Sequence, residues 1–183
     1  MRNGPRVLLV SPYGPNHLGW GENMYDLLQS RLARGHGIFQ LASHCHYFAL
    51  YLIAENLSCP TTVLENPRWD DFESELDEGY DYVGIQLKSL HTDKVARMMK
   101  RIREKCPDTK IIVGGYGVGT LWHPVPGDKN GDAVYIRENA DYLCREEGVR
   151  FMRRILGDEP VEREIMQYHL PLCGMGVALS LIH

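Results

Sequence analysis

The chain has 183 residues, 44% hydrophobic and 24% charged, which is long enough for one globular domain with its own core. Its net charge of −4 gives no electrostatic reason to expect nucleic acid or an anionic membrane as a partner. No apolar stretch approaches the length of a transmembrane helix, and the apolar run near the N-terminus is too short for a signal peptide. We therefore expect a cytoplasmic protein.

The first part of the chain predicts one strand and two helices. The apolar run Val7–Val10 predicts a strand over residues 6–12, and four glycine or proline residues predict a loop over 13–21. Apolar residues at helical spacing then predict a helix over 21–34. After a break at two glycines, a second apolar stripe predicts a longer helix over 40–56.

The middle of the chain predicts the centre of a parallel sheet. β-Branched residues at Thr61–Leu64 predict a second strand, and the acidic stretch 69–77 predicts a short surface helix. Residues 80–118 predict a third strand, a loop at 89–91, an amphipathic helix and a fourth strand that ends at Gly114–Gly115. Two buried strands joined by a crossover helix imply parallel pairing.

Beyond the fourth strand, the sequence predicts less regular structure. Residues 116–137 are rich in Gly, Pro and Asp, and we expect a long loop with a short strand at Ala133–Ile136. A last edge strand is predicted at Tyr142–Cys144, and a helix is predicted over 146–156.

The alternation of strands and helices predicts a doubly wound α/β fold with a mostly parallel, five-stranded, Rossmann-like sheet in flavodoxin-like order. This domain is expected over residues 1–157, and 158–183 is expected to be a linker or the start of a missing C-terminal domain. Ligands of such folds bind outside the carboxyl ends of the strands. The loops at 13–21, 88–91 and 114–119 should therefore line one crevice.

Short motifs follow these strands in a definite order. Ser89-Leu90 follows the third strand, and Gly114-Gly115 ends the fourth. Ala140-Asp141 comes later, before the run Arg145–Gly148. In this order and spacing, the chain resembles the N-terminal cobalamin (vitamin B12)-binding domain of B12-dependent radical SAM proteins over nearly its whole length.

The resemblance implies a domain that binds cobalamin at the carboxyl edge of the sheet, with no catalytic residue and no metal ligand of its own. It implies a radical SAM domain or protein as partner, and methyltransferase-type chemistry if the chain belongs to an enzyme. The chain lacks the C-x-x-x-C-x-x-C run of radical SAM enzymes, so neither an iron–sulfur cluster nor S-adenosylmethionine is expected in it. The residues expected to contact cobalamin are Tyr13, Asn16, His17, Ser89, Leu90, Gly114, Gly115, Tyr116 and Gly117.

Several of these residues also have a purely structural interpretation. His17 is either a cobalt ligand or a solvated loop residue, because Pro15 stands where an acid that orients such a histidine is expected. Ser89 contacts the nucleotide tail of the cofactor or, like Thr92, caps the next helix. Gly114–Gly115 allows either the close approach of a planar ligand or a tight turn.

The chain departs from the family pattern at Pro15, Trp20, Glu146 and Val149. These departures favour an alternative of another class, a cofactor-free Rossmann-like regulatory or protein-interaction domain. In that alternative, Tyr13 or Trp20 would plug the crevice at the end of the sheet. An open cleft there would favour the cofactor-binding interpretation.

Overall fold

One parallel sheet organises the chain. The computed structural model describes residues 4–13, 47–123 and 130–160. Within them, five strands form a sheet in the order β2-β1-β3-β4-β5, and every neighbouring pair is parallel. The strands are β1 (Val7–Val10), β2 (Thr61–Leu64), β3 (Tyr82–Gln86), β4 (Lys110–Gly114) and β5 (Tyr142–Leu143). This order confirms the predicted flavodoxin-like, doubly wound fold.

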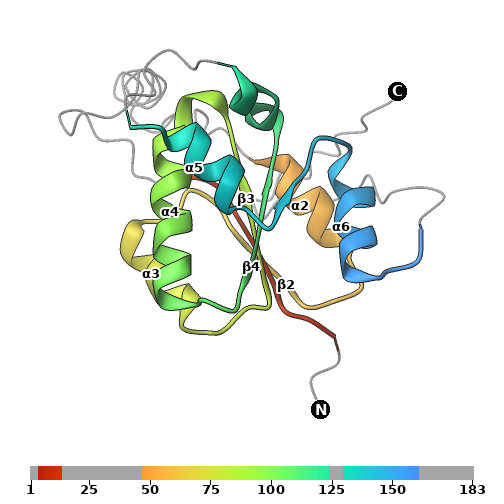
Figure 1. Cartoon of the computed structure of the whole chain (residues 1–183). Helices are drawn as coiled ribbons and strands as arrows, with labels where there is room; N and C mark the ends of the chain where they lie inside the picture. Colours follow the sequence, from red (N-terminus) through yellow and green to blue (C-terminus); the bar gives the residue numbers. More distant parts are fainter. Residues whose placement is uncertain (1–3, 14–46, 124–129, 161–183) are drawn as a thin grey trace, which may run out of the picture.

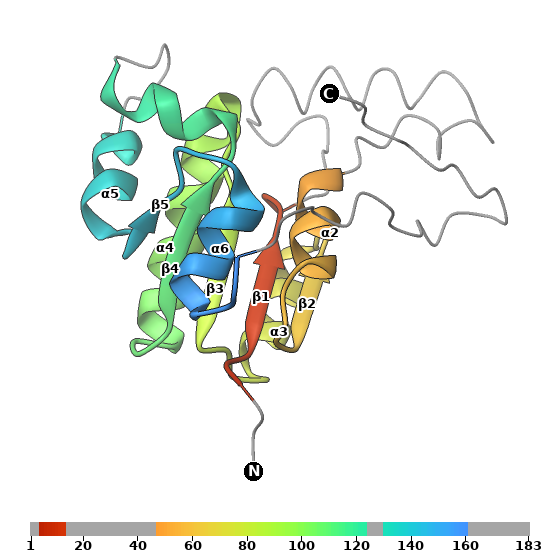
Figure 2. The ribbon, with the colours of Figure 1, turned by 90° about the vertical axis from the view of Figure 1, so that its right-hand side faces the viewer.

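Helices cover both faces of the sheet, as Figure 1 shows. One layer consists of α3 (Trp69–Leu76), α4 (Thr92–Lys105) and α5 (Asp132–Asn139). The opposite layer consists of α2 (Phe48–Glu55) and α6 (Gly148–Leu156), which face the viewer in Figure 2. Two short 3-10 helices, η2 (Ser89–His91) and η3 (Tyr116–Trp122), follow β3 and β4. Within the described segments, no helix has both the length and the apolar character needed to cross a membrane.

Strand residues alternate between the two helical layers. In β3, Val83 and Ile85 pack in the core shared with α3, α4 and α5. Gly84, between them, faces the opposite layer. All four residues of β1 are buried because helices cover both faces of this central strand.

Most predicted elements are present. β2 begins and ends where the sequence predicts, and the predicted edge strand and last helix correspond to β5 and α6. The acidic helix over 69–77 is α3, although its Phe72 is fully buried. The helix predicted over 40–56 is described only from α2 onward. The helix predicted over 21–34 lies outside the described residues, as does the chain from 161 onward.

The prediction for the segment after β4 was wrong. Tyr116–Trp122 is a 3-10 helix, and Ala133–Ile136, predicted as a short strand, belongs to helix α5. Burial explains the difference, because Ala133 and Ile136 are three residues apart and both buried, whereas Val134 is 42% exposed. That spacing places the two buried side chains on one face of a helix.

Candidate functional site

A cavity of about 570 Å³ lies between the sheet and the α2/α6 layer, toward the carboxyl ends of the central strands. Its floor contains Leu9, Gly84 and Ile112, which are register partners across β1, β3 and β4. A Cβ atom at Gly84 would lie 2.8 Å from Cδ2 of Leu9. Glycine at position 84 therefore leaves room for the Leu9 side chain to lie against β3. No side chain from position 84 projects into the cavity.

The walls of the cavity come from the two helices that Figure 2 shows in front of the sheet. The wall residues are mostly apolar: Ala49, Leu50, Leu52 and Ile53 of α2, and Gly148, Phe151 and Met152 of α6. The helices approach closely, because a Cβ atom at Gly148 would lie 2.8 Å from Cδ1 of Ile53. A volume of this size with an apolar lining is typical of sites for small organic molecules.

The next row of the floor is polar. Gln86, the last residue of β3, pairs in register with Gly114, the last residue of β4, and both line the cavity. Gln86 lies on the same face as Gly84 because strand side chains alternate. Its Oε1 atom is buried and has no hydrogen-bond partner in the described part of the chain. Because Gly114 has no side chain, nothing from β4 covers the Gln86 amide.

Gly115 forms a tight turn beside this amide. Its φ of 97° and ψ of 174° are typical of glycine alone. A Cβ atom there would lie 2.8 Å from the Leu87 carbonyl oxygen and 3.2 Å from Cγ of Gln86. The same carbonyl accepts a hydrogen bond from the amide of Gly117 at 3.0 Å. Glycine at 115 therefore shapes both the turn and the space around Gln86.

Two other polar side chains that line the cavity, Glu147 and Cys144, already have partners. The Glu147 carboxylate caps α6, accepting hydrogen bonds from the amides of Val149 at 2.7 Å and Arg150 at 2.8 Å. The Cys144 thiol donates to the carbonyl of Glu146 at 3.3 Å, and burial raises the pKa of this thiol. A protonated, buried thiol is a poor nucleophile.

At the rim, the carboxylate of Glu146 forms an exposed ion pair with Arg154. The hydrogen bond from Arg154 lowers the pKa of Glu146. The guanidinium of Arg145 lies 4.6 Å from the ring centroid of Trp122, which is itself partly exposed. The mouth of the cavity is therefore charged and aromatic, whereas the interior is apolar.

Three of the predicted cofactor contacts line this cavity: Gly114, Gly115 and Tyr116, the last of which is 97% exposed at the mouth. Gly117 does not line it. A Cβ atom at Gly117 would lie 2.7 Å from Cγ of Leu87, so this glycine allows η3 to pack against the end of β3.

Ser89 and Leu90 also lie outside the cavity lining. The Ser89 hydroxyl accepts a hydrogen bond from Oγ1 of Thr120 at 3.4 Å and so ties η2 to η3. Leu90 is 51% exposed. The proposed capping role is absent as well, because no side chain caps the N-terminus of α4; Thr92 instead donates to the carbonyl of Ser89.

Tyr13 packs on the opposite side of the sheet. Its ring makes an edge-on contact with Trp69 of α3, at 4.9 Å between ring centroids, and its carbonyl accepts a hydrogen bond from Nζ of Lys94. Tyr13 therefore does not plug the cavity. Asn16, His17 and Trp20 lie outside the described residues.

Sequence analysis missed Gln86 and the helical walls as site residues. The alternation of side chains along the predicted third strand could have placed Gln86 on the same face as Gly84, two residues earlier. The walls had no comparable signal. Ile53 and Gly148 meet only because the fold brings α2 and α6 together.

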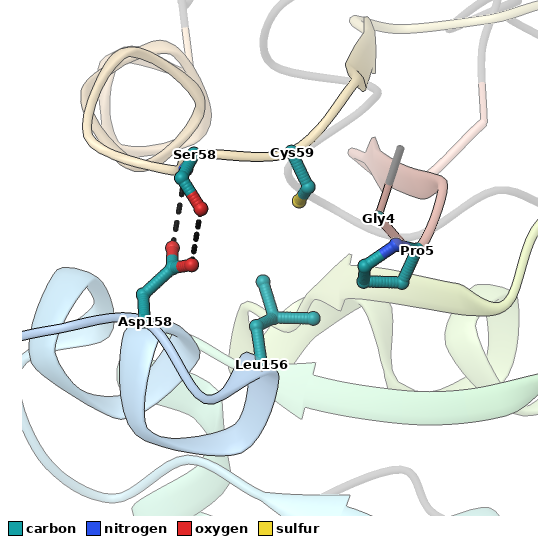
Figure 3. Close-up of a pocket in the computed structure, with 6 residues that line it drawn as sticks. All are labelled: Gly4, Pro5, Ser58, Cys59, Leu156 and Asp158. Atoms are coloured by element: carbon teal, nitrogen blue, oxygen red, sulfur yellow. Dashed lines mark hydrogen bonds between the residues drawn. The ribbon is translucent and has the colours of Figure 1, made fainter. Parts of the chain in front are cut away.

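A second hollow, of about 460 Å³, lies at the amino end of the strands and is shown in Figure 3. Ser58 binds Asp158 there through its amide, at 3.1 Å, and through its hydroxyl. Burial raises the pKa of the nearby Cys59 thiol. The polar groups are thus engaged with one another, and the raised pKa keeps the thiol protonated at neutral pH, so this hollow is the weaker candidate. No group of His, Cys, Asp or Glu in segments 4–13, 47–123 and 130–160 is arranged to hold a metal ion.

The chain matches no protein-family model and no curated protein. Among solved structures, it is similar to a cobalamin-binding protein from Desulfitobacterium hafniense DCB-2, at 16% sequence identity and a TM-score of 0.40. The match covers 82% of this chain and 58% of that protein. The chain therefore spans less than two thirds of the length of that protein.

Proposed function

We propose that this domain binds a corrinoid of the cobalamin type, with the nucleotide tail of the cofactor in the α2/α6 cavity and the corrin ring at the carboxyl edge of the sheet. The observation that carries the proposal is the apolar cavity itself, which opens beside Gly114 and Gly115. These glycines belong to the Gly-Gly motif on which the sequence resemblance rests. The cavity and the motif thus point to the same edge of the fold.

The chemistry of the residues fits such a cofactor. A nucleotide tail ends in a flat heteroaromatic base, which suits an apolar cavity with few polar groups. Gly84, Gly114 and Gly115 line the cavity without adding side chains to it, and Gln86 offers a buried hydrogen-bonding group. A corrinoid, when bound, supplies a cobalt centre able to carry a methyl group. The rim, with Arg145 and Tyr116, would contact the polar periphery of the corrin.

The part of this chain in any reaction would be to hold the cofactor. We propose that a radical SAM domain or partner protein supplies the iron–sulfur cluster and S-adenosylmethionine, because the chain lacks the cluster motif. Isolated, iron-reconstituted protein should therefore leave S-adenosylmethionine intact. Cleavage by the purified chain would refute this division of roles.

Titration with hydroxocobalamin tests the binding proposal. Corrin absorbance should co-elute with the protein in gel filtration, and a hundredfold excess of ligand over its dissociation constant should raise the unfolding free energy by about 2.7 kcal/mol. An unchanged melting curve at saturating cobalamin, with no co-elution, would refute cofactor binding. That outcome would favour the cofactor-free regulatory or interaction domain.

A matched pair of variants locates the site. Ala49 is exposed at the cavity mouth on α2, so Ala49→Trp should obstruct the cavity without disturbing the core. We expect a loss of affinity of about tenfold or more, equivalent to about 1.4 kcal/mol. Val134→Trp on α5 adds a similar exposed ring on the far side of the sheet and should leave affinity unchanged. Equal affinities for both variants would place the ligand elsewhere.

Thiol protection gives a second readout of location. Cys144 lines the cavity, whereas Cys106 packs against the core of the opposite helical layer. Bound hydroxocobalamin should slow alkylation of Cys144 and leave Cys106 unaffected, as measured by peptide mass spectrometry. Protection of Cys106 alone would contradict the proposed site.

A further inference from the structure

Gln86 lines the cavity and carries a buried polar atom that has no hydrogen-bond partner in the described residues. Its Oε1 atom is shielded from solvent and unbonded within residues 4–13, 47–123 and 130–160. By contrast, the Glu147 carboxylate caps α6, the Cys144 thiol donates to a carbonyl, and the Glu146 carboxylate binds Arg154. Leaving a buried amide oxygen unbonded destabilises the protein. A ligand that supplied a donor to this oxygen would offset part of that destabilisation.

The surroundings of Gln86 define what such a ligand must look like. Its register partner is Gly114, and Gly115 lies alongside with 3.2 Å between a would-be Cβ atom and Cγ of Gln86. Neither glycine places a side chain over the Gln86 amide, so a rotation of this buried carboxamide would bring it to the edge of a flat group bound in the cavity. The floor beyond it, at Gly84 and Ile112, is apolar. The ligand should be planar and aromatic, with its hydrogen-bonding edge toward β3.

A carboxamide presents an acceptor and a donor side by side. The matching edge is one that has an N–H donor next to a ring nitrogen, and adenine has such an edge, which glutamine can bind through two hydrogen bonds. A dimethylbenzimidazole base has one acceptor nitrogen and no N–H group. It can bind the amide nitrogen of Gln86, but it leaves the oxygen unbonded.

We propose, on the premise that the cavity takes the tail of a corrinoid, that Gln86 selects a tail whose base carries an amino group beside a ring nitrogen, as adenine does. Gln86 is then the residue that determines specificity among corrinoids, and Ser89, which is bonded to Thr120 outside the cavity, has no part in it. One additional hydrogen bond is worth about 0.5–1.5 kcal/mol, so the adenine form should bind about three- to tenfold more tightly.

The experiment compares three probes by isothermal titration calorimetry: cyanocobalamin, the cyano corrinoid with an adenine base, and dicyanocobinamide, which has no base. The wild-type chain should bind the adenine form most tightly and cobinamide most weakly. In Gln86→Met, which keeps the volume and removes the amide, the preference between the two bases should disappear. Circular dichroism melting checks that this variant folds.

The outcomes separate this inference from the proposed function. Equal affinity of the wild-type chain for the two bases, or a preference that survives in Gln86→Met, would overturn the role of Gln86 while corrinoid binding stands. Equal binding of all three probes would overturn the placement of the tail in the cavity. Failure of every probe to bind would overturn corrinoid binding, and the inference with it.

Discussion

The turn after β4 requires glycine at position 115, so Gly115→Ala should destabilise the fold strongly. Placing a side chain in this region of backbone conformation costs about 1–3 kcal/mol. The new Cβ atom would also lie 2.8 Å from the carbonyl oxygen of Leu87, which accepts the hydrogen bond from Gly117. Displacing Leu87 weakens this bond and the one from its own amide to Gly114, at about 0.5–1.5 kcal/mol each. Together the two effects predict a loss of about 2–6 kcal/mol.

Two control variants separate these effects. Gly157 ends α6 with φ 75° and has no atom within 4 Å of a would-be Cβ, so Gly157→Ala should show the conformational penalty alone, about 1–2 kcal/mol. Gly119 has neither a positive φ nor a close neighbour, and Gly119→Ala should change stability by less than about 0.5 kcal/mol.

Equilibrium unfolding in urea measures all three variants, with the midpoints compared at a constant m-value. If Gly115→Ala is no more destabilising than Gly157→Ala, the contact with Leu87 has no energetic weight and the reasoning fails. The same contact argues against a bulky substitution such as Gly115→Val as a test of binding. That variant would disturb the fold before it blocked a ligand.

Three further substitutions test other parts of the fold. Burial alone would raise the pKa of Asp141, but hydrogen bonds from the amide of Ile111 and from Arg103 bring it below its ordinary value. A lowered pKa stabilises the folded state above the unfolded pKa of about 3.9, and this stabilisation is lost as pH falls through the lower pKa of the folded state. The urea midpoints of wild type and Asp141→Asn should therefore differ at pH 7, and the difference should shrink progressively as pH falls below about 4. A difference that is as large at low pH as at pH 7 would contradict this assignment. Glu147→Ala removes the cap of α6 and should cost about 0.5–2 kcal/mol in urea unfolding, and an unchanged midpoint would show that the cap is dispensable. Phe72→Ala empties a fully buried site under α3 and should cost about 3–5 kcal/mol, measured by thermal melting; a loss below 1 kcal/mol would mean that the neighbouring side chains fill the space.

The sheet could be predicted from the sequence because burial on both faces leaves a strong local signal. The β-branched run at Thr61–Leu64 and the apolar run before Gly114 each correspond closely to a strand. The same signal misled at Ala133–Ile136, where valine, tyrosine and isoleucine favour a strand in isolation. Packing against α4 overrode that preference and formed α5.

The candidate site was predictable only in part. Gly114 and Gly115 stand out because glycines that end a strand leave room for a turn or a ligand. Ser89 and Tyr13 resembled ligand contacts by position, but each is bound to a neighbour that the sequence could not identify, Thr120 and Trp69. The apolar walls arise from tertiary packing, which no local pattern encodes.

The walls of the cavity form where α2 and α6, the first and last described helices, pack against each other. Ile53 of α2 meets Gly148 of α6, and close by Arg153 donates to the carbonyl of Asn56, a contact that spans 97 positions in the sequence. A growing chain therefore has no cavity until α6 has been synthesised and has docked. Ligand binding therefore requires the complete fold. A chain that stops before Gly148 would keep most of the sheet but would lack α6, which forms one wall of the cavity.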